Sequence, residues 1–111
     1  MLNNSYIYFI TIKDEEGELK TVTEENYKDI IVDCEYSIKI SENDNDLLED
    51  RFEKLAEDWY NLEEKTSEKW AEWNNKAADY EKQKRENKEE IKKCENTIKI
   101  IETFAEVNGW E

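Results

Sequence analysis

Acidic side chains are the residues of this sequence whose number and spacing most suggest a site. Between residues 46 and 64 they recur at spacings that keep several of them on one side of a helix. The members of this row are Asp46, Glu49, Asp50, Glu53, Glu57, Asp58, Glu63 and Glu64. Duplex DNA carries one negative charge per roughly 1.7 Å of its axis, and the basic clefts that bind DNA would also attract such a row. The row therefore predicts either an ordinary solvated helix face or a surface that mimics nucleic acid.

Two aromatic residues flank the main apolar stripe of the same region. Tyr60 and Trp70 are harder to bury than Trp59, Trp73 and Tyr80, which we expect to be core residues. Exposed tryptophan and tyrosine beside acids are typical of protein-binding hot spots. The aromatic residues could alternatively line a small-ligand pocket at a dimer seam. We therefore predict that the eight acids, together with Tyr60 and Trp70, bind a partner.

Catalytic and metal-binding patterns are weak in this sequence. It has no histidine, which is the commonest general base near neutral pH and the commonest metal ligand. The alternating acids of 42–46 echo a calcium-binding loop, but Leu47 stands where such a loop needs glycine. Cys34 and Cys94 lack the Cys-x-x-Cys spacing of a structural zinc site, and we expect them to be reduced core residues. We predict no enzymatic activity, no metal and no cofactor.

The net charge narrows the classes of partner. The chain has 111 residues, with 30 acidic and 16 basic side chains and a net charge of -14. This charge repels nucleic acid and anionic membranes, attracts basic surfaces and also keeps a protein soluble. The apolar run at 6–12 is too short to span a bilayer, which needs about 20 residues. We expect a cytoplasmic protein whose partner is a basic protein.

The first 41 residues have the pattern of strands. Residues 6–12 are β-branched and aromatic, and a polar turn ending at Gly17 leads into an alternating segment at 19–23. Every even position in residues 30–40 is apolar, whereas Ile31 is the one apolar residue among the odd positions. This alternation is typical of a half-buried strand. Residues 1–41 are therefore predicted to form a three-stranded antiparallel sheet.

Residues 45–108 have the pattern of helices. Apolar residues recur at spacings of three and four within 48–62, 70–80 and 91–105, as in a coiled coil. The register slips between the first two segments, and a stutter or a break near Thr66 and Ser67 would absorb the slip.

The position of the turn between the helices is left open by the sequence. Residues 81–90 contain no apolar side chain, and Asn87 with Glu90 resembles an N-cap, so we favour a helical hairpin that turns near 83–88. One continuous helix is the alternative. Asn108 and Gly109 are a typical helix stop.

The two halves of the helical part have opposite net charge, which favours their pairing. Residues 42–64 hold ten acids and two bases, whereas residues 81–99 hold seven bases and five acids. The halves could pair within one chain or between two chains, so a homodimer is one expected outcome. The predicted fold is α+β, a single domain over 1–111.

The chain resembles the small acidic proteins that bacteriophages use against host defences, including anti-CRISPR proteins. The shared features are size, charge, residue usage, the order of sheet then helices, and the acidic run from Glu42 to Glu64. The resemblance covers the character of the whole chain and no particular motif. It implies an inhibitor that blocks a nucleic-acid-binding enzyme of the host bacterium, such as a CRISPR nuclease. The alternatives are a self-associating coiled-coil scaffold and a protein that sequesters a small ligand such as a nucleotide.

Overall fold

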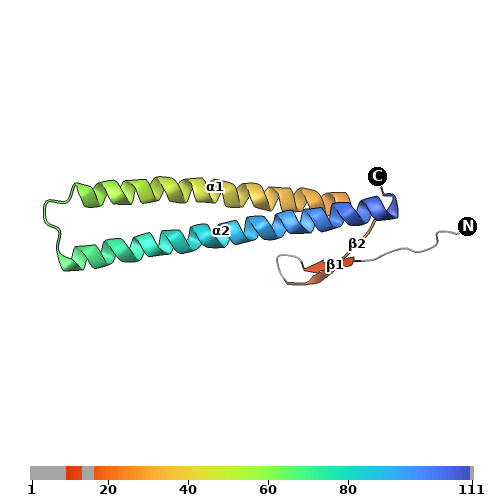
Figure 1. Ribbon diagram of the computed structural model, residues 1–111, viewed down its shortest axis with the longest axis horizontal. Coiled ribbons are helices and arrows are strands. Elements are labelled where there is room, and N and C mark those ends of the chain that lie inside the picture. The colour runs from red at the N-terminus through yellow and green to blue at the C-terminus, as the bar shows by residue number, and fades with distance from the viewer. Residues whose placement is uncertain (1–9, 14–16, 111) are drawn as a thin grey trace, which may run out of the picture. The chain divides into compact units, whose positions relative to one another are not determined.

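The computed structural model describes residues 10–13 and 17–110, which contain two strands followed by two long helices (Figure 1). The elements are β1 (Ile10–Lys13), β2 (Leu19–Val22), α1 (Tyr27–Tyr60) and α2 (Ser67–Asn108). The chain divides into two compact units. The terminal unit combines the described residues up to Ser37 with those from Lys93 onward, and the central unit is Ile38–Lys92.

The two strands form the predicted hairpin in the terminal unit. They pair antiparallel, with Ile10 opposite Val22 and Lys13 opposite Leu19. Gly17, in the connection, has a φ of 81°, a conformation that glycine adopts without steric cost. The hairpin prediction is confirmed for these strands, while its residues 6–9 and 14–16 lie outside the described residues.

The third predicted strand is wrong, because residues 30–40 belong to α1. The alternation in this segment coincides with a second pattern, in which Ile31, Cys34 and Ile38 are spaced three and four residues apart. The helix uses that second pattern and leaves half of the alternating residues exposed. The exposed residues are Val32, Tyr36 and Ile40. Within the described residues the sheet therefore has two strands, and the helical part begins at Tyr27 rather than near residue 45.

A capping box fixes the start of α1. The backbone N–H of Asn26 donates to Thr23 Oγ1 at 3.3 Å, and the backbone N–H of Thr23 donates to Asn26 Oδ1 at 2.8 Å. These reciprocal bonds satisfy backbone donors that the first helical turn would otherwise leave without partners. The segment between β2 and α1 is thereby committed to starting a helix.

The core of the terminal unit joins residues from both ends of the chain. Its fully buried members are Val22 and Ile101, and Tyr27, Ile30 and Ala105 are almost as well buried. The hairpin contributes Ile10 and Ile12, which pack against this cluster. Cys34 packs there as well, and Cys94 is buried in the same unit; no disulfide joins the two.

The end of α2 has the predicted stop. Gly109 has a φ of 72°, and its N–H donates to the carbonyl of Glu106 at 3.1 Å. The N–H of Trp110 donates to the carbonyl of Ala105 at 2.8 Å, which completes a Schellman motif. The reversal directs the Trp110 ring onto Tyr27, with 5.3 Å between the ring centroids.

In the central unit, α1 and α2 form an antiparallel helical hairpin. The turn lies at residues 61–66, so the predicted turn at 83–88 is wrong and those residues lie within α2. The predicted break near Thr66 and Ser67 is confirmed, since Thr66 caps α2 by accepting a hydrogen bond from the N–H of Lys69 at 3.2 Å. Leu48 and Ala77 are buried between the helices, with 1% and 8% exposure.

Candidate partner-binding surface

Four of the predicted acids form one line along α1. Their spacing of four, three and four residues repeats that of the packed residues Leu48, Phe52, Leu55 and Trp59, with an offset of two. An offset of two residues rotates a side chain by about 200° around a helix with 3.6 residues per turn, so these carboxylates lie opposite the packed face. All four are exposed. This line, the acidic stripe, consists of Asp46, Asp50, Glu53 and Glu57.

The other four predicted acids lie beside or beyond the acidic stripe, and all are exposed. Glu49 flanks it on one side, and its carboxylate is 3.3 Å from Lys84 Nζ of α2. Asp58 flanks it on the other side. Glu63 and Glu64 belong to the turn between the helices. The predicted row is therefore a stripe with two flanking acids and two acids at the turn.

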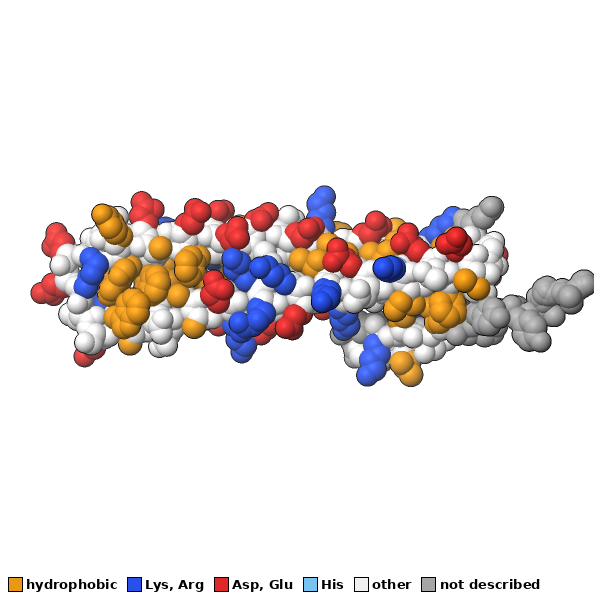
Figure 2. Space-filling view, viewed as in Figure 1, with side chains coloured by type: hydrophobic (Ala, Val, Ile, Leu, Met, Phe, Trp, Pro, Cys, Tyr) orange, Lys and Arg blue, Asp and Glu red, His pale blue; other side chains and the backbone are white. Residues whose placement is uncertain are grey.

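The density of negative charge along α1 resembles that of one nucleic-acid strand. Six carboxylates lie between Asp46 and Asp58. At 1.5 Å per residue these span about 18 Å, or about one charge per 3 Å, compared with about 3.4 Å in one strand of duplex DNA. The two bases of this stretch, Arg51 and Lys54, both lie on the flank that carries Asp58 and not within the acidic stripe. Figure 2 shows acidic side chains along the outer edge of α1.

Three tryptophans pack together near the turn of the central unit. We call Trp59, Trp70 and Trp73 the tryptophan cluster. Ring centroids are 5.4 Å apart for Trp59 and Trp70, and also for Trp70 and Trp73, whose rings stack at 16°. Trp73 Nε1–H donates to the carbonyl oxygen of Leu55 at 2.9 Å, which ties α2 to α1. Phe52 extends the aromatic contact, with 6.3 Å to the Trp73 ring.

The two aromatic residues predicted to bind a partner are both exposed, to different extents. Trp70 is 49% exposed although it belongs to the tryptophan cluster, and Tyr60, the last residue of α1, is 81% exposed. Lys65 links this region: its ammonium lies 5.9 Å from the centroid of the Trp59 ring. The same ammonium donates to the carbonyl oxygens of Tyr60, the last residue of α1, and of Leu62 in the turn. The structure thus places Tyr60 and Trp70 near the turn, beyond the acidic stripe.

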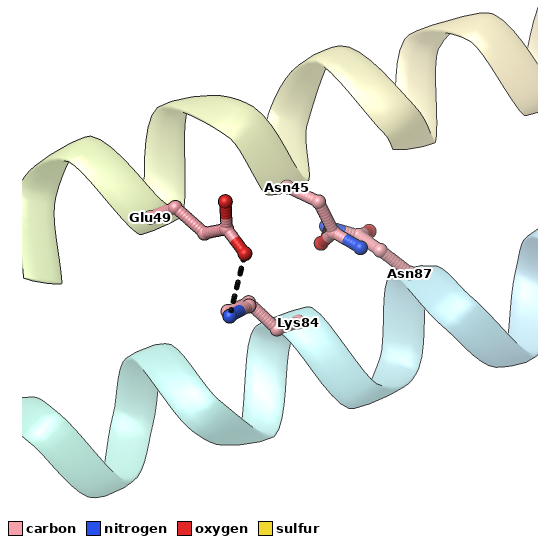
Figure 3. A network of polar contacts seen from close by, with 4 residues as sticks. All are labelled: Asn45, Glu49, Lys84 and Asn87. Atoms are coloured by element: carbon pink, nitrogen blue, oxygen red, sulfur yellow. Dashed lines mark hydrogen bonds and ion pairs between the residues drawn. The ribbon is translucent and has the colours of Figure 1, made fainter.

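A polar layer between the helices was not predicted. Asn87 Nδ2 donates to Asp44 Oδ2 at 2.6 Å and to Asn45 Oδ1 at 2.9 Å. Figure 3 shows Asn87 directed toward Asn45, one turn away from the ion pair of Lys84 and Glu49. Asn87 is therefore an interhelical residue and not the N-cap that its sequence context suggests. The available signal was its spacing, since Lys84 and Asn87 follow Tyr80 at steps of four and three.

The acids that echo a calcium-binding loop do not form a loop in the structure. Residues 42–53, whose acids echo a calcium loop, lie entirely within α1, and a helix cannot wrap its side chains around one ion. Within the described part of the chain, no cluster of three Cys, Asp or Glu residues is arranged to hold a metal ion. Neither of the two described helices contains an apolar stretch long enough to cross a bilayer.

Comparison of the chain with protein-family models, with curated proteins and with solved structures finds no match.

Proposed function

We propose that the protein acts by binding: it presents the acidic stripe of α1 to a basic protein and blocks the nucleic-acid site of that protein. The position of the stripe carries the proposal. Its four carboxylates are exposed on the side of α1 opposite the residues that pack against α2. The expected partner is a nucleic-acid-binding enzyme of a host bacterium, such as a CRISPR nuclease, encountered in the host cytoplasm.

The hairpin gives the stripe a fixed geometry. Leu48 is buried against α2, and Trp73 donates a hydrogen bond to the carbonyl oxygen of Leu55, so the packed face of α1 cannot rotate freely. The backbone that carries these carboxylates is already ordered, so association costs only the ordering of the exposed side chains. The net charge of -14 accelerates encounter with a basic partner. Both effects favour binding to a cleft built for phosphates.

Charge reversal tests the proposal. In the stripe variant, Asp46, Asp50, Glu53 and Glu57 are all replaced by Lys. A matched control variant likewise has four acidic residues replaced by Lys, all of them exposed residues of the terminal unit. The replaced residues in the control are Asp33, Glu35, Glu102 and Glu106. Because the two variants have the same net charge, they differ only in where the charge is placed.

The assay is capture of proteins from a nuclease-treated bacterial lysate, followed by nucleic-acid binding measurements on the purified partner. We expect the natural chain and the control variant to retain one basic nucleic-acid-binding protein and to inhibit its binding to DNA or RNA. The stripe variant should do neither, and high salt should release the partner, since exposed charges are screened. Equal retention by the two variants, or retention that competing nucleic acid does not reduce, would contradict the proposal.

Self-association is a second candidate function, favoured by apolar side chains on the surface of the terminal unit. Val32 on α1 is 59% exposed, and Ile100 and Val107 on α2 are 50% and 64% exposed. Sedimentation of the natural chain and of a Val32→Asp, Val107→Asp variant would test it. A monomer for the natural chain at all concentrations rules out this candidate, whereas an oligomer that the variant loses supports it.

A further inference from the structure

The surface around the turn of the central unit combines exposed aromatic rings with a surplus of carboxylates. Trp70 is 49% exposed and Tyr60 is 81% exposed, although both belong to residue types that a monomer usually buries at least in part. Figure 2 shows hydrophobic side chains gathered on this face near the turn, bordered by acidic ones. Residues 57–72 hold six acids and two bases, Lys65 and Lys69. The chemistry of this surface therefore favours a cationic group.

The tryptophan cluster already accepts one cation from its own chain. The ammonium of Lys65 lies 5.9 Å from the centroid of the Trp59 ring, within the range of a cation–π contact. That ammonium also donates to two backbone carbonyl oxygens, so it is held in place at the end of α1. The position over Trp59 is therefore filled, whereas Trp70 keeps about half of its surface accessible.

The orientation of the exposed Trp70 ring favours arginine over lysine as the basic side chain that a partner presents to it. Trp70 has one ring face stacked on Trp73 at 5.4 Å, which holds the indole in a fixed orientation. A planar guanidinium stacks on such a ring and can still donate paired hydrogen bonds to a neighbouring carboxylate. An ammonium is more strongly hydrated and offers no plane to stack.

We propose that the exposed rings of Trp70 and Tyr60 form an anchor that selects arginine over lysine in the basic segment of the partner. The inference rests on the proposed function for the existence of a basic partner. The acidic stripe attracts positive charge of either kind, because its long-range attraction depends on charge and is the same for both cations. The aromatic anchor adds discrimination, so the partner's contact segment is rich in arginine.

Two synthetic peptides test the anchor on the full-length protein. One is a short glycine–serine peptide that contains four arginines, and the other has lysine at the same positions. Each carries a fluorescent label, and binding is followed by fluorescence anisotropy so that the loss of a tryptophan does not affect the signal. We expect the natural chain to bind the arginine peptide about two- to fivefold more tightly than the lysine peptide, the range that an exposed cation–π contact provides.

Three variants separate the aromatic anchor from the acidic stripe. Trp70→Leu and Tyr60→Leu should each reduce the arginine preference while changing the affinity for the lysine peptide little. Tyr60→Leu also serves as the folding-safe variant, because the Tyr60 side chain is mostly exposed. Tyr36→Leu is the matched control, an equally conservative change at a 67% exposed tyrosine of α1 in the terminal unit, and it should preserve the preference.

The outcomes for the two proposals are distinct. Equal affinity of the natural chain for both peptides overturns the anchor, and so does a preference that survives in both Trp70→Leu and Tyr60→Leu. The stripe variant should weaken both peptides by a similar factor and keep their ratio. If it binds both as tightly as the natural chain does, the stripe is not the attracting surface and the proposed function fails, whatever the ratio shows.

Discussion

Replacing Leu48 by alanine gives a direct test of how α1 faces α2. Leu48 is 1% exposed, whereas its neighbour Leu47 is 53% exposed on the same helix. The same substitution at both positions removes the same atoms and changes helix propensity equally. The difference between the two variants therefore isolates burial in the central unit.

The expected magnitudes follow from the exposed fractions. Leu→Ala removes three carbon atoms, and at about 0.8 kcal/mol per buried carbon the transfer loss at Leu48 is about 2.4 kcal/mol. Incomplete collapse around the site raises the total loss in free energy of unfolding to about 3 kcal/mol. At Leu47 about half of the side chain is already in water and no cavity forms, so the loss should be about 1 kcal/mol or less.

Urea unfolding followed by tryptophan fluorescence is the appropriate assay, because Trp59, Trp70 and Trp73 all lie in the central unit. Far-UV circular dichroism, recorded on the same samples, shows whether the terminal unit unfolds in the same transition. A difference of about 2 kcal/mol between the variants is expected. Equal losses, or a larger loss for Leu47→Ala, would refute the assignment of Leu48 to the interhelical face.

Three further predictions concern single contacts. Trp73→Phe keeps an aromatic ring but removes the donor to the Leu55 carbonyl, and should lower the free energy of unfolding in urea by about 1 kcal/mol. Gly109→Ala places a side chain at a φ of 72° and should lower the melting stability by about 1 kcal/mol, whereas Val107→Ala at an exposed site should be nearly neutral. Asn87→Asp removes the donor to Asp44 and places a second carboxylate beside it, so repulsion should lower the melting temperature relative to the natural chain. This deficit should be larger at neutral pH than at acid pH, where carboxylates are protonated, and thermal melting of both chains across pH measures it.

Each of these predictions has a result that contradicts it. A Trp73→Phe variant as stable as the natural chain would show that the hydrogen bond to Leu55 contributes nothing. Equal melting of Gly109→Ala and Val107→Ala would argue against the Schellman motif. An Asn87→Asp variant with the same pH profile as the natural chain would mean that residue 87 does not face Asp44.

Elements that are defined by local turn or cap residues were predicted correctly from the sequence. Elements that depend on how the two helices pack were not. The hairpin, the break before Ser67 and the stop at Gly109 each follow from turn or cap residues, and the structure has all three. The strand predicted at 30–40 was wrong because its alternation coincides with the helical spacing of Ile31, Cys34 and Ile38. The turn predicted at 83–88 was wrong because the interhelical pattern of α2 continues there through polar residues, which were interpreted as an interruption.

In both helices the interhelical spacing continues through polar positions. On α1 the spacing of three and four residues passes from Ile38 through Ser41 and Asn45 to Leu48. On α2 it passes from Tyr80 through Lys84 and Asn87 to Ile91, also without a break. Because Asn87 bonds to Asn45, the polar positions of one helix meet those of the other. A polar layer of this kind specifies register at some cost in stability, and apolar periodicity alone does not reveal it.

The candidate surface was predictable in part. The spacing of the acidic stripe and the exposure of Tyr60 follow from helical geometry, and the structure agrees with both. The stacking of Trp70 on Trp73, and the ammonium of Lys65 over Trp59, depend on where the turn lies. Those contacts could not be predicted, because the main turn was expected at 83–88 and lies at 61–66.

The composition of the terminal unit has a consequence for the order of folding. Its core joins Val22, Tyr27 and Ile30 to Ile101 and Ala105, which lie about seventy or more positions later in the chain. The central unit needs only the short turn at 61–66, so its helices can meet at a much lower entropic cost of loop closure. At a synthesis rate of about 5–20 residues per second, several seconds pass before the later half of the terminal core exists. During that interval Val22, Tyr27 and Ile30 lack their native contacts with Ile101 and Ala105 and are accessible to chaperones, so we expect the terminal unit to fold after the central unit.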